Sequence, residues 1–242
     1  MLLAGSAGAQ VTYPSVVDRA VGVRTALHPG AVGENVRPRW CVEVADAELF
    51  GIAGLRVVGV QSAATLGPAM LRIELAQVAS PVGDHTRGVV EAGHVHAGGW
   101  QGGVRAGVER VALRGALPER TLVGGVFSRA ELGPVSLVAD VEAMSGAFVR
   151  STSVSIAALG RAGAIATVVG SLRFDGSRMV AAGVAVVARP DARLRLIAGY
   201  DDGTDTSRVA ARIAVGRVEV ATGVTHHAVL GLSHGLSVTW TR

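Results

Sequence analysis

Residues 208–225 read RVAARIAVGRVEVATGVT, and the alternation in this stretch decides the fold. Val209, Ala211, Ile213 and Val215 form one row of side chains, and Arg208, Ala210, Arg212 and Ala214 form the other. Residues 217–225 repeat the pattern after Gly216. Because successive side chains of a β-strand point to opposite faces, each segment is expected to be a strand with one apolar and one polar face.

The same alternation recurs along the chain from about Leu55 onward. Segments of roughly 9–12 residues are separated by turn signals such as Leu66-Gly67-Pro68 and Asp175-Gly176. In residues 71–75, for example, leucine and isoleucine alternate with Arg72 and Glu74. The pattern predicts a single all-β domain with about 12–14 strands.

Two architectures use such strands. A soluble β-sandwich turns its apolar face to a core and its charged face to water. A transmembrane β-barrel turns the apolar face to lipid and the charged face to its lumen. The number of segments exceeds that of an ordinary sandwich, and their length suits the ~9–11 residues of a tilted membrane strand. We therefore predict a transmembrane antiparallel β-barrel, with a secreted soluble β-sandwich, acting as a binding or structural module, as the alternative.

Aromatic residues are scarce, at 4% of the chain, whereas membrane barrels carry aromatic girdles at both interfaces. Only five tryptophans and tyrosines could serve: Tyr13, Trp40, Trp100, Tyr200 and Trp240.

If the barrel prediction holds, charged residues on the polar faces line the lumen, since an arginine at the bilayer midplane costs about 2–4 kcal/mol. This row of lumen-facing candidates comprises Glu74, Asp140, Glu142, Arg193, Arg195, Arg208, Arg212, Arg217 and Glu219. Two interpretations remain open at this stage. The charges form either a weakly anion-preferring pore lining or ion pairs that fill and rigidify a narrow barrel.

Composition excludes several other classes of protein. The chain has 242 residues and one cysteine, Cys41, which rules out an internal disulfide framework and a zinc site built on a cysteine cluster. All 23 basic residues are arginine, but with 19 acidic residues interspersed the net charge of +4 is too small to indicate nucleic-acid binding.

The beginning of the sequence suggests export. Ala7-Gly8-Ala9 has the form of a signal-peptidase site, so residues 1–9 are interpreted as the remnant of a signal peptide. Residues 10–50 are expected to form a hatch, a plug or a first strand, and residues 51–242 the barrel. No run of about 20 apolar residues predicts a membrane-spanning helix.

Two motifs could suggest catalysis or metal binding. Gly231-Leu232-Ser233-His234-Gly235 has the Gly-x-Ser-x-Gly form of a hydrolase nucleophile elbow, which requires a strand-to-helix turn. Here the motif enters an alternating strand. His94 and His96 have a spacing that a metal could use, but we interpret them as polar residues at a strand end or in the lumen. We therefore predict no catalytic residue, no metal site and no cofactor.

The last fifty residues carry a resemblance to a known family. Residues 226–234, HHAVLGLSH, follow a Gly-Tyr-containing segment at 199–200 and lead into the final strand. Arg193–Arg242 thereby resembles the closing strands of PorV-like, FadL-related outer-membrane barrels, with Ala228 where proline is common in that family. The family's Asn-Pro-Ala-Gly-Leu segment is not present near the beginning of the chain.

The resemblance implies an outer-membrane location in contact with the lipid bilayer and a function other than catalysis. The protein is expected to conduct a small, apolar solute, or to be a membrane-embedded component of a secretion or surface-attachment system, in contact with other envelope proteins.

Overall fold

The computed structural model describes residues 40–49, 51, 54–95, 100–146, 150–176, 178–202 and 205–242. The predicted signal remnant, Tyr13 and residues 10–39 of the predicted N-terminal segment lie outside this part. The described residues form fourteen strands: β1 (Trp40–Glu48), β2 (Arg56–Leu66), β3 (Ala69–Ser80), β4 (Gly83–Val95), β5 (Trp100–Leu113), β6 (Glu119–Leu132), β7 (Val135–Gly146), β8 (Arg150–Ala162), β9 (Ala166–Asp175), β10 (Arg178–Ala188), β11 (Leu194–Asp201), β12 (Thr206–Val215), β13 (Val218–His227) and β14 (Gly231–Thr241).

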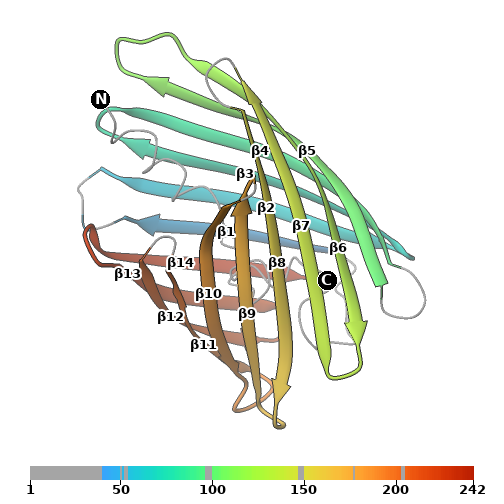
Figure 1. Ribbon diagram of the computed structural model, residues 1–242. Coiled ribbons are helices and arrows are strands. Elements are labelled where there is room, and N and C mark those ends of the chain that lie inside the picture. Colours follow the sequence, from blue (N-terminus) through green and yellow to red (C-terminus); the bar gives the residue numbers. More distant parts are fainter. Residues whose placement is uncertain are drawn as a thin grey trace.

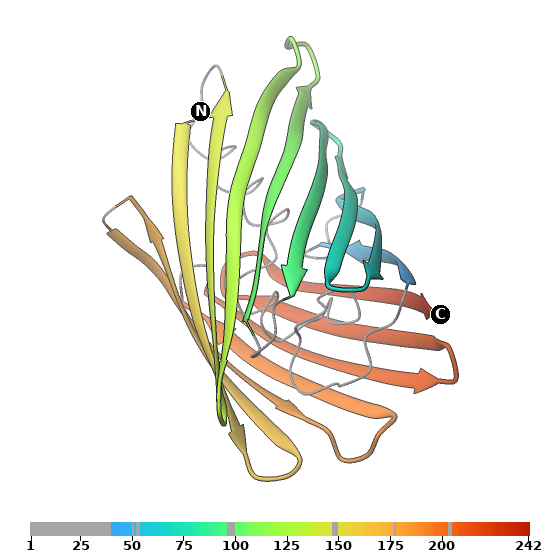
Figure 2. The same ribbon diagram turned by 90° about the vertical axis from the view of Figure 1, so that its right-hand side faces the viewer.

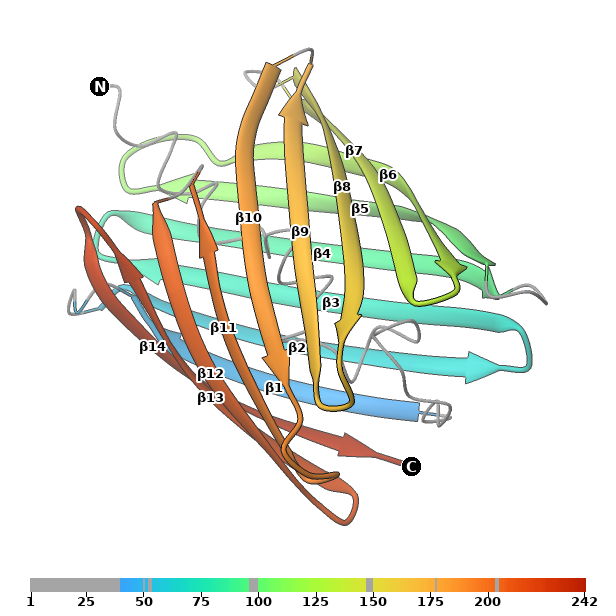
Figure 3. The ribbon, with the colours of Figure 1, turned by 60° about the horizontal axis from the view of Figure 1, so that its bottom comes forward.

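The strands close into a single antiparallel barrel (Figures 1 and 2). Each strand pairs with its neighbour in the sequence, and β14 pairs with β1 from Cys41–Thr241 to Glu48–His234, which closes the ring (Figure 3). This architecture confirms the predicted β-barrel at the upper end of the predicted strand number. The sandwich alternative is wrong, because both edges of the sheet pair with each other and, among the described residues, no second sheet covers the apolar face.

The two faces of the sheet carry opposite kinds of side chain. In β3 exposed and buried residues alternate, with leucine and isoleucine exposed and Arg72 and Glu74 buried. In β12 Arg212 is 2% exposed, whereas its neighbour Ile213 is 52% exposed. A soluble protein has the reverse distribution, so the outward face is suited to hydrocarbon rather than water.

The two ends of the barrel differ on their outward face. At one end β1 and β5 begin and β14 ends, with Trp40, Trp100 and Trp240; we call it the tryptophan rim. Trp40 and Trp240 pack edge to face, with ring centroids 5.2 Å apart. At the other end outward arginines lie near the ends of their strands; this arginine rim comprises Arg56, Arg110, Arg120 and Arg150.

Tight turns join the strands at both rims. Gly67-Pro68 and Gly133-Pro134 each make a two-residue turn at the tryptophan rim. Gly67 and Gly133 have φ values of 60° and 65°, in the left-handed region that glycine adopts without steric cost. The turn signals of the sequence therefore fall where the chain reverses. In the described residues no helix is long and apolar enough to cross a membrane.

Candidate functional site

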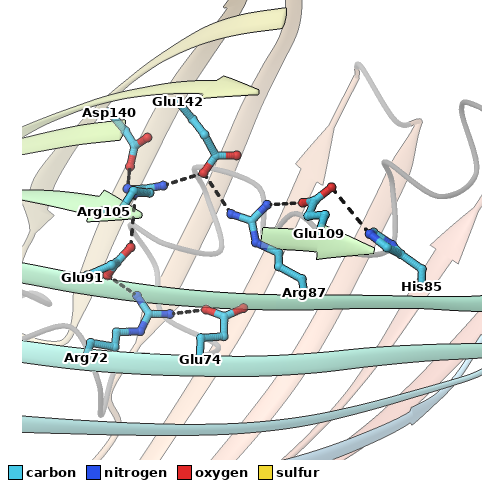
Figure 4. Close-up of polar contacts among 9 residues, drawn as sticks. All are labelled: Arg72, Glu74, His85, Arg87, Glu91, Arg105, Glu109, Asp140 and Glu142. Carbon is cyan, nitrogen blue, oxygen red and sulfur yellow. Dashed lines mark hydrogen bonds and ion pairs between the residues drawn. The ribbon is translucent and has the colours of Figure 1, made fainter. Parts of the chain in front are cut away.

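The inward face of β1–β7 carries a continuous set of ion pairs and hydrogen bonds, which we call the charged wall. Figure 4 shows nine of its members: Arg72, Glu74, His85, Arg87, Glu91, Arg105, Glu109, Asp140 and Glu142. They come from four strands, β3, β4, β5 and β7, and β6 lies between the last two.

Arg105 on β5 lies at the centre of this wall. Its guanidinium donates to Glu142 at 2.9 Å, lies 3.4 Å from Glu91 and also pairs with Asp140. Glu142 in turn accepts a bond of 2.9 Å from Arg87. These side-chain contacts join β7 to β5 and to β4, strands that share no backbone hydrogen bonds with it.

Arg72 on β3 extends the wall toward β1. It bonds to Glu91 at 2.9 Å and to Glu74 at 2.8 Å, and it donates to the side-chain oxygen of Gln61 at 3.1 Å. Gln61 donates to Glu43 on β1 at 3.0 Å. A chain of polar contacts therefore runs from the first strand to the seventh.

Arg87 extends the wall in the other direction. It donates to Glu109 at 2.6 Å, and His85 lies 3.5 Å from the same carboxylate. Buried carboxylates and guanidinium groups are costly to desolvate, and mutual pairing of this kind is what makes their burial tolerable.

Glycines in β5 and β6 make room for the long side chains. Gly125 lies between Arg105 and Glu142 in the register, and it has no side chain to separate them. The Phe127 ring packs over the position of Gly103 and lies 5.9 Å below the guanidinium carbon of Arg105. This distance is typical of a cation–π contact, so the Phe127 ring stabilises the position of the Arg105 guanidinium.

The inward charges are divided between opposite sides of the barrel. The inward face of β1–β7 has six buried carboxylates, of Glu43, Glu74, Glu91, Glu109, Asp140 and Glu142, and four buried guanidinium groups, of Arg72, Arg87, Arg105 and Arg129. In a ring of fourteen strands β11 lies opposite β4. There, β11–β13 carry inward Arg195, Arg208, Arg212 and Glu219, with Arg212 and Glu219 paired at 2.6 Å. One side is therefore acid-rich and the opposite side base-rich.

On β8–β11 an aliphatic cluster occupies part of the inward face, beside the buried hydroxyl side chains of Ser155, Thr167 and Ser171. Ala157 and Leu159 on β8, Val169 on β9 and Ile197 on β11 are at most 4% exposed and belong to one cluster. The barrel interior thus offers a charged surface and an aliphatic surface side by side.

The structure places the nine residues predicted for the lumen in three ways. Glu74, Asp140, Glu142, Arg195 and Arg212 point inward and are buried, and Arg208 and Glu219 point inward and are half-buried. Arg193 and Arg217 are exposed and lie in turns, immediately before β11 and β13. Alternation fixes the direction of a side chain only inside a strand, so it does not apply to these two arginines.

The sequence interpretation missed most of the charged wall. Arg87 and Glu91 lie four residues apart in β4, and Arg105 and Glu109 have the same spacing in β5. Both pairs therefore share a face of their strand, and this spacing was the available signal.

The other motifs have structural positions. Ser233 lies inside β14 with its side chain buried, far from any strand-to-helix turn. His94 is exposed on the outward face of β4, and His96 lies outside the described residues. His227 is buried, and its Nδ1 accepts hydrogen bonds from the backbone N–H groups of Val229 and Leu230, so it stabilises the β13–β14 turn. In the described ranges no group of three His, Cys, Asp or Glu side chains could hold a metal ion.

Comparison with known proteins supports the fold and leaves the family open. No family model matches the chain, and no curated protein matches it in sequence. Among solved structures, the TodX monoaromatic hydrocarbon channel is similar with a TM-score of 0.63 and 8% identity, over 83% of this chain and 87% of that one. The outer membrane protein Omp33 of Acinetobacter baumannii is similar with a TM-score of 0.56 and 11% identity, over 85% and 98%. The chain therefore has the fold of outer-membrane β-barrels, in agreement with the predicted location and its contact with the lipid bilayer.

Proposed function

We propose that this protein is a non-catalytic outer-membrane channel for small solutes. The observation that carries the proposal is the inverted distribution of side chains, with aliphatic residues on the outward face and ionised residues on the inward face. An inward face of ion pairs is compatible with water, and an outward aliphatic face is compatible with lipid. The resemblance of residues 193–242 to PorV-like, FadL-related barrels supports the same function.

The arrangement of charges favours small polar solutes that carry both signs of charge. The acid-rich side on β1–β7 and the base-rich side on β11–β13 face each other, so a solute between them experiences a field across the barrel. A dipolar solute gains by orienting in this field, whereas a neutral apolar one gains nothing from it. The pairing of most inward arginines supports the interpretation of a rigid, charge-paired lining over an anion-preferring one.

The aliphatic surface on β8–β11 supports a second candidate, the apolar solute implied by the family resemblance. Its cluster of Ala157, Leu159, Val169 and Ile197 could contact such a solute without desolvating a charge. A role in a secretion or surface-attachment system stays a prediction from the resemblance.

The test is reconstitution of the purified chain in planar bilayers and in liposomes. We expect ion conductance, and faster liposome swelling with zwitterionic amino acids than with uncharged sugars of equal size. Faster uptake of aromatic hydrocarbons than of zwitterions would favour the apolar candidate. A barrel that is folded, as judged by heat-modifiable gel mobility, and that passes neither ions nor solutes would contradict the channel.

The same assay addresses the predicted plug. A chain that lacks residues 1–39 is expected to conduct more than the full chain if the N-terminal segment closes the lumen. Equal conductance of the two chains would count against a plug.

A further inference from the structure

Three outward arginines at the arginine rim form an unusual group. Arg110 on β5 and Arg120 on β6 are direct partners in the register of the sheet. Side chains in this relationship have Cβ atoms about 4.5–5.5 Å apart, and like charges so placed destabilise the pairing of the strands. Both residues are exposed, and both point away from the barrel interior.

Arg150 extends this group by two strands. It pairs in register with Ser145 on β7, and Ser145 pairs with Leu122, one outward position from Arg120. Since neighbouring strands lie about 4.8 Å apart, the three arginines occupy a patch that is roughly 14 Å wide from β5 to β8. Strands β5–β8, green to yellow in Figure 2, stand side by side and carry the patch.

The three side chains have no internal counter-charge in the described parts of the chain. Neither Arg110, Arg120 nor Arg150 takes part in an ion pair. The nearest outward acid in the register, Asp84, lies opposite Ala112 and pairs with none of them. Arg56 on β2 is different, because its guanidinium binds the carboxylate of Asp46.

The height of the patch corresponds to the headgroup region of a bilayer. Arg110 lies ten residues after Trp100 on the same strand, and the outward residues between them are uncharged. Ten residues at about 3.3 Å each, tilted by about 40–45°, rise roughly 24 Å along the membrane normal. This height matches the ~25 Å apolar band of membrane barrels, so the patch lies immediately above it, opposite the indole of Trp100.

Outer-membrane barrels have short turns on the periplasmic side and longer loops on the outer side. The longest connection between the described strands, residues 49–55, lies at the arginine rim, so this rim is assigned to the outer leaflet. The two-residue turns 67–68, 133–134 and 216–217 all lie at the tryptophan rim. The lipid with clustered phosphate groups in that leaflet is lipopolysaccharide. Guanidinium groups bind phosphate oxygens in a bidentate manner, and a bound phosphate removes the repulsion between Arg110 and Arg120.

We propose that Arg110, Arg120 and Arg150 form a binding site for the phosphate groups of lipopolysaccharide on the outward face of the barrel. The site depends on the membrane location of the protein and is independent of conduction through the lumen.

The test measures lipopolysaccharide binding to the purified full chain in detergent by native mass spectrometry. We compare intact lipopolysaccharide, the same molecule with its phosphates removed, and phosphatidylglycerol. Wild-type protein should bind the intact form at least about tenfold more tightly than the dephosphorylated form, and this comparison requires no variant.

The combined variant Arg110→Gln, Arg120→Gln and Arg150→Gln should lose that preference and keep its heat-modifiable mobility and its conductance. Arg56→Gln is the matched control, since its guanidinium already has a counter-charge, and it should bind as the wild type does. Equal binding by wild type and the combined variant would overturn the proposal. Phosphatidylglycerol bound as tightly through the same arginines would overturn the choice of lipid, and an equal loss in Arg56→Gln would overturn the choice of residues.

Discussion

Arg105 on β5 and Glu142 on β7 form an ion pair of 2.9 Å across a third strand, and Gly125 of β6 lies between them. The pair exists because the intervening residue has no side chain. A Cβ atom at position 125 would lie 2.5 Å from the carbonyl oxygen of Val141 and 3.1 Å from Cγ of Arg105. This relationship makes the charged wall continuous, and it can be tested by adding one methyl group.

Gly125→Ala should destabilise the barrel by about 1–3 kcal/mol, the usual cost of overpacking, because either the backbone or Arg105 must move. The measurement is urea unfolding in detergent, followed by tryptophan fluorescence. Gly124→Ala is the matched control, since a Cβ there meets nothing within 4 Å. The control should be neutral or slightly stabilising, and equal losses in the two variants would contradict the role given to Gly125.

Glu142→Gln removes the carboxylate shared by Arg87 and Arg105. Breaking a buried ion pair typically costs about 3–5 kcal/mol, because the remaining charge is left without compensation. We expect a loss in that range, measured as the shift of the unfolding midpoint. Glu131→Gln changes a carboxylate that is 41% exposed and paired with Arg129, so it should cost less than about 1 kcal/mol. A smaller loss for Glu142→Gln than for Glu131→Gln would argue against a structural role of the charged wall.

The same substitution, to arginine, at the adjacent residues Val60 and Gln61 tests which face of the sheet points outward. Val60→Arg places a charge on the outward face midway along β2, at a cost of about 2–4 kcal/mol, and should lower the yield of folded barrel in the membrane. Gln61→Arg points inward, where its register partners Glu43 and Glu74 supply counter-charge. It loses the bond that Gln61 accepts from Arg72, so it should assemble less well than the wild type but clearly better than Val60→Arg. The assay is heat-modifiable mobility of outer-membrane fractions. Similar yields for both variants would refute the assignment of the faces.

Trp240→Leu removes half of the edge-to-face pair that joins the last strand to the first. An aromatic pair contributes about 0.5–1.5 kcal/mol beyond the burial of its area, so the unfolding midpoint should fall by a corresponding amount. Trp100→Leu removes a tryptophan at the same rim but away from the closure, where its indole N–H donates to Ser128 at 2.9 Å. In the double variant Trp40→Leu, Trp240→Leu, the additional loss of unfolding free energy relative to Trp240→Leu alone should not exceed the packing contribution of one ring. A fully additive loss would show that the two rings act independently.

The strands were predictable because alternation is local. Arg212 is charged and its neighbour Ile213 is apolar, and a β-strand places two such adjacent side chains on opposite faces of the sheet. The pairing of β1 with β14 was beyond this reasoning, since Cys41 and Thr241 are two hundred residues apart. A local pattern of side chains does not encode a contact between residues that are so far apart in the sequence. In addition, β1 is only nine residues long, so its alternation is a weak signal.

The sequence predicted that charged side chains line the inside of the barrel, but it identified only some of the residues that do so. Glu74, Asp140 and Glu142 were named from their own strands. Glu74 pairs with Arg72 on the same strand, but Asp140 and Glu142 pair with Arg105 and Arg87, which come from strands two and three positions away. Those pairings follow from the register and from the reach of an arginine side chain across a glycine. Arg193 and Arg217 show the limit of the reasoning, because the alternation was extended beyond the strand ends.

The unequal lengths of the strands impose a demand on the surrounding lipid. β5 and β6 contain fourteen residues each, whereas β11 on the opposite side contains eight. Six residues of a tilted strand correspond to roughly 14 Å of height. Acyl chains beside β11 must therefore be compressed, or the axis of the cylinder must lean, and either response gives the molecule a preferred neighbour and a preferred orientation in the plane of the membrane.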